Sequence, residues 1–127
     1  MPEAAADIAF ALDLLSGLGA VSARRMFGGV GLYAQGVMFG LIDDGRIYLK
    51  TDAPLEADLR AAGATSWMYA EARGPKAGVS QETSYLSLPE PAIDDPDEAA
   101  AWARRAFAVA AAKRAAVPKR RKARASR

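Results

Sequence analysis

Apolar and polar residues alternate along residues 28–50, and this alternation predicts three short strands. In the last run, Ile47 and Leu49 fall on one face, because a period of two places successive side chains on opposite faces of a strand. The pairs Gln35-Gly36 and Asp44-Gly45 separate the runs, and X-Gly pairs supply the positive φ angles of tight hairpin turns. We therefore expect an antiparallel meander with strands at 28–34, 37–42 and 46–50.

Three other stretches have apolar residues at helical spacing. Ile8, Leu12 and Leu15 form one stripe on an Ala-rich segment, which favours a helix. After the meander, Thr51 or Asp52 can cap a second helix, because short polar side chains accept bonds from the first free N–H groups of a helix. The predicted helices are 4–18, 54–62 and 96–116, the last ending before Pro118.

Two further alternating runs, 66–72 and 83–90, predict strands on either side of a loop at 73–81. The element order is then α-β-β-β-α-β-β-α, which indicates an α+β fold with a five-stranded antiparallel sheet and helices packed against it in a second layer. We expect the sheet and the helices to share one core that includes Phe39, Leu41, Leu49, Leu59, Trp102 and Val109.

Catalytic and metal-binding residue types are scarce in this sequence. The chain has no Cys and no His, so disulfides and thiolate metal sites are excluded and the commonest general base is missing. The glycines at 28–31 precede a strand rather than a helix, and Lys76 does not follow the glycine order of a phosphate-binding loop. Asp43-Asp44 and Asp94-Asp95 are explained by a turn and a helix cap. We expect no catalytic residue, no cofactor and no metal site.

Several short motifs follow one another in a fixed order. They are a basic residue before Met-Phe-Gly-Gly (25–29), Gly-Leu-Tyr (31–33), Gly-x-Met-Phe (36–39), Ile-Tyr-Leu-Lys (47–50), Ser-Tyr-Leu (84–86), Leu-Pro (88–89) and Trp-Ala (102–103). Together they resemble the N-terminal domain of the TfoX/Sxy proteins, bacterial regulators of natural competence. The resemblance covers nearly the whole chain to about residue 112.

This resemblance implies a five-stranded antiparallel sheet with helices, similar to the folds of secretion chaperones, in agreement with the element order. Full-length competence regulators carry a second, helical C-terminal domain. Here a basic segment follows instead, so we expect one domain at 1–117 and a disordered basic tail at 118–127.

A basic and aromatic edge is the candidate partner-binding site. The resemblance places Arg25 at the family's recurring basic position, and this edge would contact an acidic surface of a partner. The candidate residues are Arg24, Arg25, Tyr33, Tyr48 and Lys50, with Tyr85 as a further member of an aromatic patch. The alternative is a structural role, in which the charges are solvated or pair with Asp43 or Glu71 and the rings pack across strands.

Positive charge is concentrated in the tail. The last ten residues hold six of the 17 Lys and Arg and none of the 15 acidic residues, so residues 1–117 contain 11 basic and 15 acidic side chains and carry a net charge of −4. Such a segment attracts polyanions without reading their sequence. The candidate nucleic-acid residues are Lys119, Arg120, Arg121, Lys122, Arg124 and Arg127; the alternative is a solubilising terminus with no dedicated partner.

These observations favour a non-enzymatic, cytoplasmic module for regulatory protein–protein interaction, whose protein partner the sequence does not identify. The first alternative is an accessory protein that binds nucleic acid non-specifically through the tail, and the second, least favoured, is an enzyme. Apolar side chains on both faces of 37–42 predict a homodimer through the sheet face or an edge strand. Acidic residues interrupt the apolar N-terminal stretch, so no membrane segment or secretory leader is expected.

Overall fold

The computed structural model describes residues 4–26, 29–70, 74–75 and 77–125, with side chains described as far as residue 116. The helices are α1 (Ala5–Leu14), the 3-10 turn η1 (Ser16–Leu18), α2 (Ala53–Ala61), α3 (Glu90–Ile93) and α4 (Pro96–Ala125). The strands are β1 (Val21–Met26), β2 (Gly29–Ala34), β3 (Val37–Asp43), β4 (Arg46–Lys50), β5 (Ser66–Ala70) and β6 (Ser80–Ser87). None of these helices is both long enough and apolar enough to cross a bilayer.

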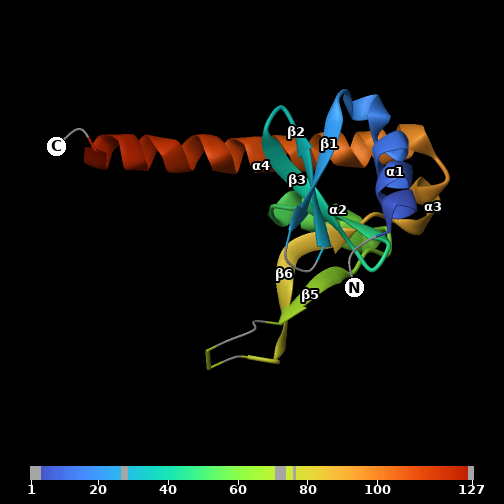
Figure 1. Cartoon of the computed structure of the whole chain (residues 1–127), viewed down its shortest axis with the longest axis horizontal. Helices are drawn as coiled ribbons and strands as arrows, with labels where there is room; N and C mark the ends of the chain where they lie inside the picture. Colours follow the sequence, from blue (N-terminus) through green and yellow to red (C-terminus); the bar gives the residue numbers. More distant parts are fainter. Residues whose placement is uncertain (1–3, 27–28, 71–73, 76, 126–127) are drawn as a thin grey trace.

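The strands form one antiparallel sheet in the order β1-β2-β3-β4-β6-β5, with β1 and β5 at its edges (Figure 1). The α+β class is confirmed, but the expected five strands and the order α-β-β-β-α-β-β-α are wrong. The missed strand is β1, which pairs with β2 over its whole length. Four of its six residues are exposed, so its hydrophobic signal is weak, as is common in an edge strand. The short helix α3 was also missed.

A β-bulge in β3 decides which side chains face the helices. Leu32 pairs with Gly40 and Tyr33 pairs with Met38, so Phe39 is an extra residue on β3. An extra residue shifts the alternation of side chains along the bulged strand. Phe39 therefore joins the core, while Met38 and Leu41 lie on the opposite face of the sheet.

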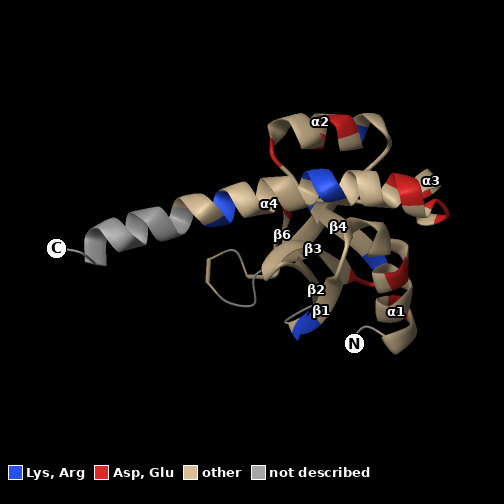
Figure 2. Ribbon diagram, turned by 90° about the horizontal axis from the view of Figure 1, so that it is seen from above, with Lys and Arg blue, Asp and Glu red and all other residues tan. Residues whose placement is uncertain are grey.

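The core lies between the sheet and the helices, which cover one face in a second layer (Figure 2). Residues from α1, α2, α3 and α4 share one buried cluster with the inward residues of β2, β3, β4 and β6. Phe39, Leu49 and Leu59 are members of this cluster as expected, and Trp102 and Val109 pack against it while only partly buried. The expectation for Leu41 is wrong: it is buried, but not in this cluster.

Helix α4 is longer than the sequence indicated. Asp95 caps its start by accepting hydrogen bonds from the N–H groups of Asp97 and Glu98, at 3.1 and 3.2 Å. Small residues, including Ala99, Ala103 and Ala106, allow the helix to lie close to the sheet. The expected end before Pro118 is wrong, because the helix continues to Ala125 and includes most of the basic segment. The division of the chain at residues 117/118 stays a prediction.

Candidate partner-binding face

The face of the sheet opposite the helices carries aromatic, methionine and basic side chains, and we call it the open face. Alternation along each strand directs these side chains to the same side. The register pairs Tyr33 with Met38 and Leu41 with Tyr48. A Cβ atom at Gly31 would contact both Tyr33 and Met26, which places these two side chains together. The open face includes Arg24, Met26, Tyr33, Met38, Leu41, Asp43, Tyr48, Lys50, Trp67, Tyr69 and Tyr85.

Trp67 is the centre of an aromatic cluster on this face. Its ring lies 6.4 Å from that of Tyr48, 5.5 Å from that of Tyr69 and 6.1 Å from that of Tyr85, centroid to centroid. The contact with Tyr85 is edge-to-face, at an interplanar angle of 86°. The indole Nε1 donates a hydrogen bond of 2.8 Å to Oδ2 of Asp43. Trp67 is therefore held in a fixed orientation by packing and by a charge-assisted bond.

Two cations lie over aromatic rings of the open face. The Arg24 guanidinium is 5.0 Å from the centroid of the Tyr33 ring, and the Lys50 Nζ is 5.0 Å from that of Tyr85. The Lys50 ammonium also donates a hydrogen bond of 2.7 Å to Oγ of Ser84. Both distances are within the range of cation–π attraction. Arg24 and Lys50 thus present positive charge beside the aromatic surface.

Partial burial changes the acid–base properties at Lys50 and Tyr85. Burial lowers the pKa of the Lys50 ammonium, and the positive charge of Lys113 on α4 lowers that pKa further. Burial also raises the pKa of the Tyr85 phenol, with a smaller contribution from Tyr33. Both shifts follow from removing a charged form from water. The Lys50 charge is therefore incompletely solvated, and an anion brought to this face would stabilise it.

The structure brings together four of the five predicted partner-binding residues, namely Arg24, Tyr33, Tyr48 and Lys50. Arg25 is not among them, because adjacent residues of a strand point to opposite faces and Arg25 pairs with Val30 of the core side. Asp43, a suggested ion-pair partner, instead accepts the bond from Trp67, and Glu71 lies outside the described residues. The sequence did not predict the central role of Trp67. Its pattern places Trp67 and Tyr69 on the same face of a strand, but it does not show which face of the sheet they share.

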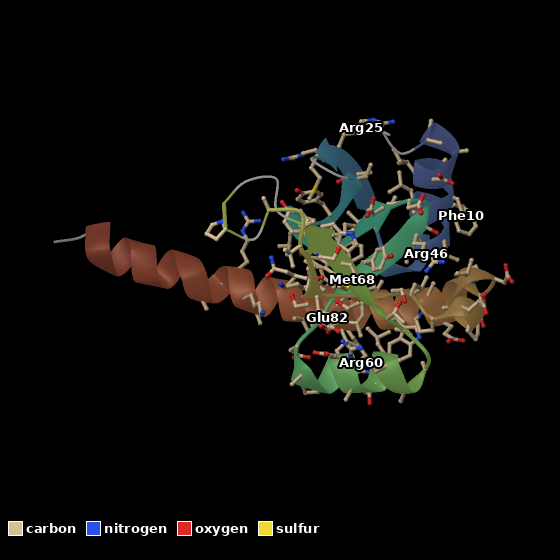
Figure 3. All side chains as sticks on the ribbon, turned by 90° about the horizontal axis from the view of Figure 1, so that it is seen from below. Phe10, Arg25, Arg46, Arg60, Met68 and Glu82 are labelled. Carbon is tan, nitrogen blue, oxygen red and sulfur yellow. The ribbon has the colours of Figure 1, made fainter. Side chains whose placement is uncertain are left out.

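Most of the acidic residues lie on the helices and their caps (Figure 2), whereas Asp43 lies on the open face, where it accepts the bond from Trp67. Glu82 of β6 points to the helix side, where it forms an ion pair with Arg60 of α2 at 3.2 Å (Figure 3). The acids on helices or caps are Asp7, Asp13, Asp52, Glu56, Asp58, Glu90, Asp94, Asp95, Asp97 and Glu98. The negative charge of the body thus lies mainly on the helices and their caps, while the open face carries Arg24 and Lys50 together with Asp43.

A hollow of about 400 Å³ lies elsewhere, between α1, the start of β4 and α3. The exposed side chains of Phe10 and Ile93 line it, and they are 50% and 40% exposed. Figure 3 shows Phe10 and Arg46 side by side at this end of the molecule. Arg46 and Glu90, of opposite charge, both line the hollow, so its charge does not select one kind of ligand.

Within the described part of the chain, no group of three or more acidic side chains is arranged to hold a metal ion. Lys119, Arg120, Arg121, Lys122 and Arg124 lie on the distal part of α4, where the structure describes the backbone and not the side chains. Arg127 lies outside the described residues. The chemistry that the described geometry supports is therefore attraction of an anionic partner to the open face.

Comparison with known proteins identifies the family. The model of the TfoX N-terminal domain matches residues 13–110, which is most of the chain. The chain belongs to the TfoX N-terminal domain family. Its similarity to DNA transformation protein TfoX1 of Aliivibrio fischeri (strain ATCC 700601 / ES114) is 41% identity over 46 residues, which are 36% of this chain and 22% of that protein. The match thus spans about a fifth of the length of this curated relative.

Proposed function

We propose that this protein is a non-enzymatic regulatory module that acts by binding an anionic macromolecular partner through the open face. The observation that carries the proposal is the separation of charge: Arg24 and Lys50 lie over aromatic rings on the open face, while most of the acidic residues lie on the helices and their caps, and the carboxylate of Asp43 on the open face is engaged by Trp67. Separated charge of this kind attracts and orients partners of opposite charge.

The regulatory setting is supported by family membership. The matched relative is named a DNA transformation protein, and we propose that this chain acts in the regulation of a competence-type process. The support for this part of the proposal is membership of the family and the similarity to that relative.

Two classes of partner carry negative charge that complements the cations of the open face. The protein–protein interaction expected from the sequence requires an acidic surface or segment on the partner protein. A nucleic acid satisfies the same charge through its phosphates, and the cations of α4 at Lys113 and Arg114 favour it as a second candidate.

One argument for a homodimer, the exposure of apolar side chains on the sheet, is weaker in the structure. It rested on apolar side chains of β3 that a one-sided sheet would expose, yet Leu41 is only 2% exposed because its neighbours on the open face cover it. A dimer that buries the open face around a two-fold axis would also bring like charges together. A homodimer through edge strand β1 or β5 remains our proposal, and a concentration-independent monomer mass would contradict it.

The test is a pull-down from cytoplasmic extract with the full chain immobilised, with and without nuclease treatment. We expect a partner that is retained by the wild type and lost with the double variant Arg24→Glu/Lys50→Glu. The matched control is Arg60→Gln, which removes an exposed cation on the helix side and should retain the partner. Retention of the same partners by the wild type and the double variant would contradict the proposal.

A further inference from the structure

We infer that the open face binds single-stranded nucleic acid, stacking its bases on the aromatic side chains and holding its phosphates with Arg24 and Lys50. This inference rests on the proposed function, because it names the partner of that same face. The stacking on the rings does not depend on the basic segment at the end of α4, which would add affinity through its charge.

The first argument is the arrangement of the rings. Tyr33, Tyr48, Trp67, Tyr69 and Tyr85 come from four strands and lie on one side of the sheet. Tyr69 is 43% exposed, and its ring is 5.5 Å from that of Trp67. Bases of a single strand stack on aromatic side chains that a sheet displays in this way. Tyr33, Tyr48, Trp67 and Tyr85 are half-buried, so a base would stack first on the exposed ring of Tyr69 and its neighbour Trp67.

The rings also favour a nucleic acid over an acidic protein segment. The face of an aromatic ring carries partial negative charge, so it repels a carboxylate. Bases instead gain from contact with a ring face, whatever their identity. Arg24 and Lys50 would attract either partner, but only a nucleic acid uses both the cations and the rings of the open face.

The same geometry favours a single strand over a duplex. In a duplex the base faces are stacked on one another, and only their edges are accessible in the grooves. Aromatic side chains on a sheet can stack only with bases that are unpaired and splayed out. A duplex would contact the cations through its phosphates and leave the rings unused.

A strand that leaves the open face at Lys50 meets further positive charge. Lys113 of α4 lies close enough to Lys50 to lower its pKa. The next residue, Arg114, donates a hydrogen bond of 2.5 Å from Nη1 to the carbonyl oxygen of Gly36, which fixes α4 against the β2–β3 turn. The basic part of α4 follows in the sequence. Lys113 and Arg114 thus extend the positive charge from Lys50 onto α4, where it can contact phosphates.

The experiment uses Trp67 as its reporter. Trp102, the second Trp, lies on α4 on the helix side, so Trp102→Phe leaves Trp67 as the only indole. Oligomers of about 12 nucleotides, thymidine or uridine, are titrated at low salt, since single-strand sites of this kind span roughly 4–16 nucleotides. We expect saturable quenching of Trp67 emission by one or both oligomers, and much weaker quenching by a duplex of the same length.

Variants of single side chains separate stacking from charge. Tyr69→Leu should weaken binding about ten-fold, because one stacking contact is lost. Arg24→Gln should reduce the slope of log affinity against log salt by about 0.7, the value for one phosphate of a single strand. The matched controls Phe10→Leu and Arg60→Gln remove an exposed ring and an exposed cation elsewhere, and should leave affinity unchanged. Removal of residues 118–127 should lower the affinity but preserve the quenching.

Three results would overturn the inference. They are unchanged Trp67 emission at low salt, equal effects of Tyr69→Leu and Phe10→Leu, and equal quenching of Trp67 by the duplex. A parallel titration with poly-glutamate separates this failure from that of the proposed function. Binding of poly-glutamate that needs Arg24 and Lys50, without single-strand binding, would overturn the inference and leave the proposed function intact. Binding of neither polyanion would overturn both.

Discussion

The indole Nε1 of Trp67 donates a hydrogen bond of 2.8 Å to the Oδ2 of Asp43, although β5 and β3 are separated in the sheet by β6 and β4. This bond connects the edge strand β5 with the β3–β4 hairpin beside the aromatic cluster of Trp67. It is therefore a tertiary link between two parts of the open face that the backbone ladder does not join directly.

Loss of this bond should loosen the edge of the sheet. Asp43→Ala is expected to lower the free energy of unfolding by about 1–3 kcal/mol, because the Trp67 N–H loses a charged acceptor. The measurement is denaturant unfolding in the Trp102→Phe background, where the emission of Trp67 should also change. Asp43→Asn keeps an acceptor oxygen and serves as the control. Equal stability of Asp43→Ala and the parent would show that the bond contributes nothing measurable.

The core should be more sensitive at Phe39 than at Trp102. Phe39 is fully buried at the bulge, so Phe39→Ala should cost about 3–5 kcal/mol. Trp102 is only partly buried, so Trp102→Ala should cost less than Phe39→Ala, although both remove a large aromatic side chain. Denaturant midpoints and slopes of the two variants decide between them. A larger loss for Trp102 would mean that α4, rather than the bulge, dominates the core.

Tyr85 should make stability depend on pH in the alkaline range. Its folded pKa is raised above the ordinary 10.0, so the folded state keeps the phenol proton that the unfolded chain loses near that pH. The stabilisation that Tyr85 contributes to the folded state is fully present below pH 10.0 and is lost as the pH rises through the folded pKa. The pKa of Lys50 is lowered from 10.5, so the unfolded chain holds this proton more tightly than the folded protein does. Between the folded pKa and pH 10.5, Lys50 therefore makes the free energy of unfolding rise with pH.

The test for Tyr85 compares the wild type with Tyr85→Phe by unfolding at a series of alkaline pH values. The stability lost by the wild type above pH 10.0, relative to the variant, is the contribution of the phenol. Ultraviolet absorbance should show tyrosinate appearing at lower pH in the unfolded chain than at Tyr85 of the folded protein. Identical pH profiles of the two proteins would contradict the assigned shift.

Non-specific binding of duplex DNA should depend on the basic segment. Up to six phosphate contacts by its Lys and Arg would give a slope of log affinity against log salt approaching about −5. Removal of residues 118–127 should abolish this binding while the far-ultraviolet circular dichroism retains the signal of the sheet and the remaining helices. Equal affinity and slope with and without the segment would place duplex binding on the body.

Much of the fold could be predicted from local patterns. The hairpin turns are an example: Gln35 and Gly36 have φ angles of 51° and 75°, and Asp44 and Gly45 have 53° and 75°, as the X-Gly pairs indicated. Asp52 caps α2 by accepting a bond of 3.1 Å from the N–H of Leu55. Turns and caps are predictable because the residues that form them are neighbours in the sequence.

The missed features depend on contacts between distant residues. Strand β1 has a weak apolar pattern and exists because β2 supplies its ladder of backbone bonds. The bulge at Phe39 cannot be seen in Val37–Asp43 alone, yet it decides that Leu41 leaves the main core and that Met38 joins the open face.

The candidate site divides in the same way. The sequence by itself determined that Tyr33 and Tyr48 alternate with core residues, that Arg24 and Lys50 accompany them, and that no Cys or His is present. Only the tertiary structure decided that β5 brings Trp67 to these rings and to Asp43, and that Arg25 points to the other face. The physical reason is that a strand's own alternation fixes which of its side chains share a face, whereas pairing between strands fixes which faces coincide.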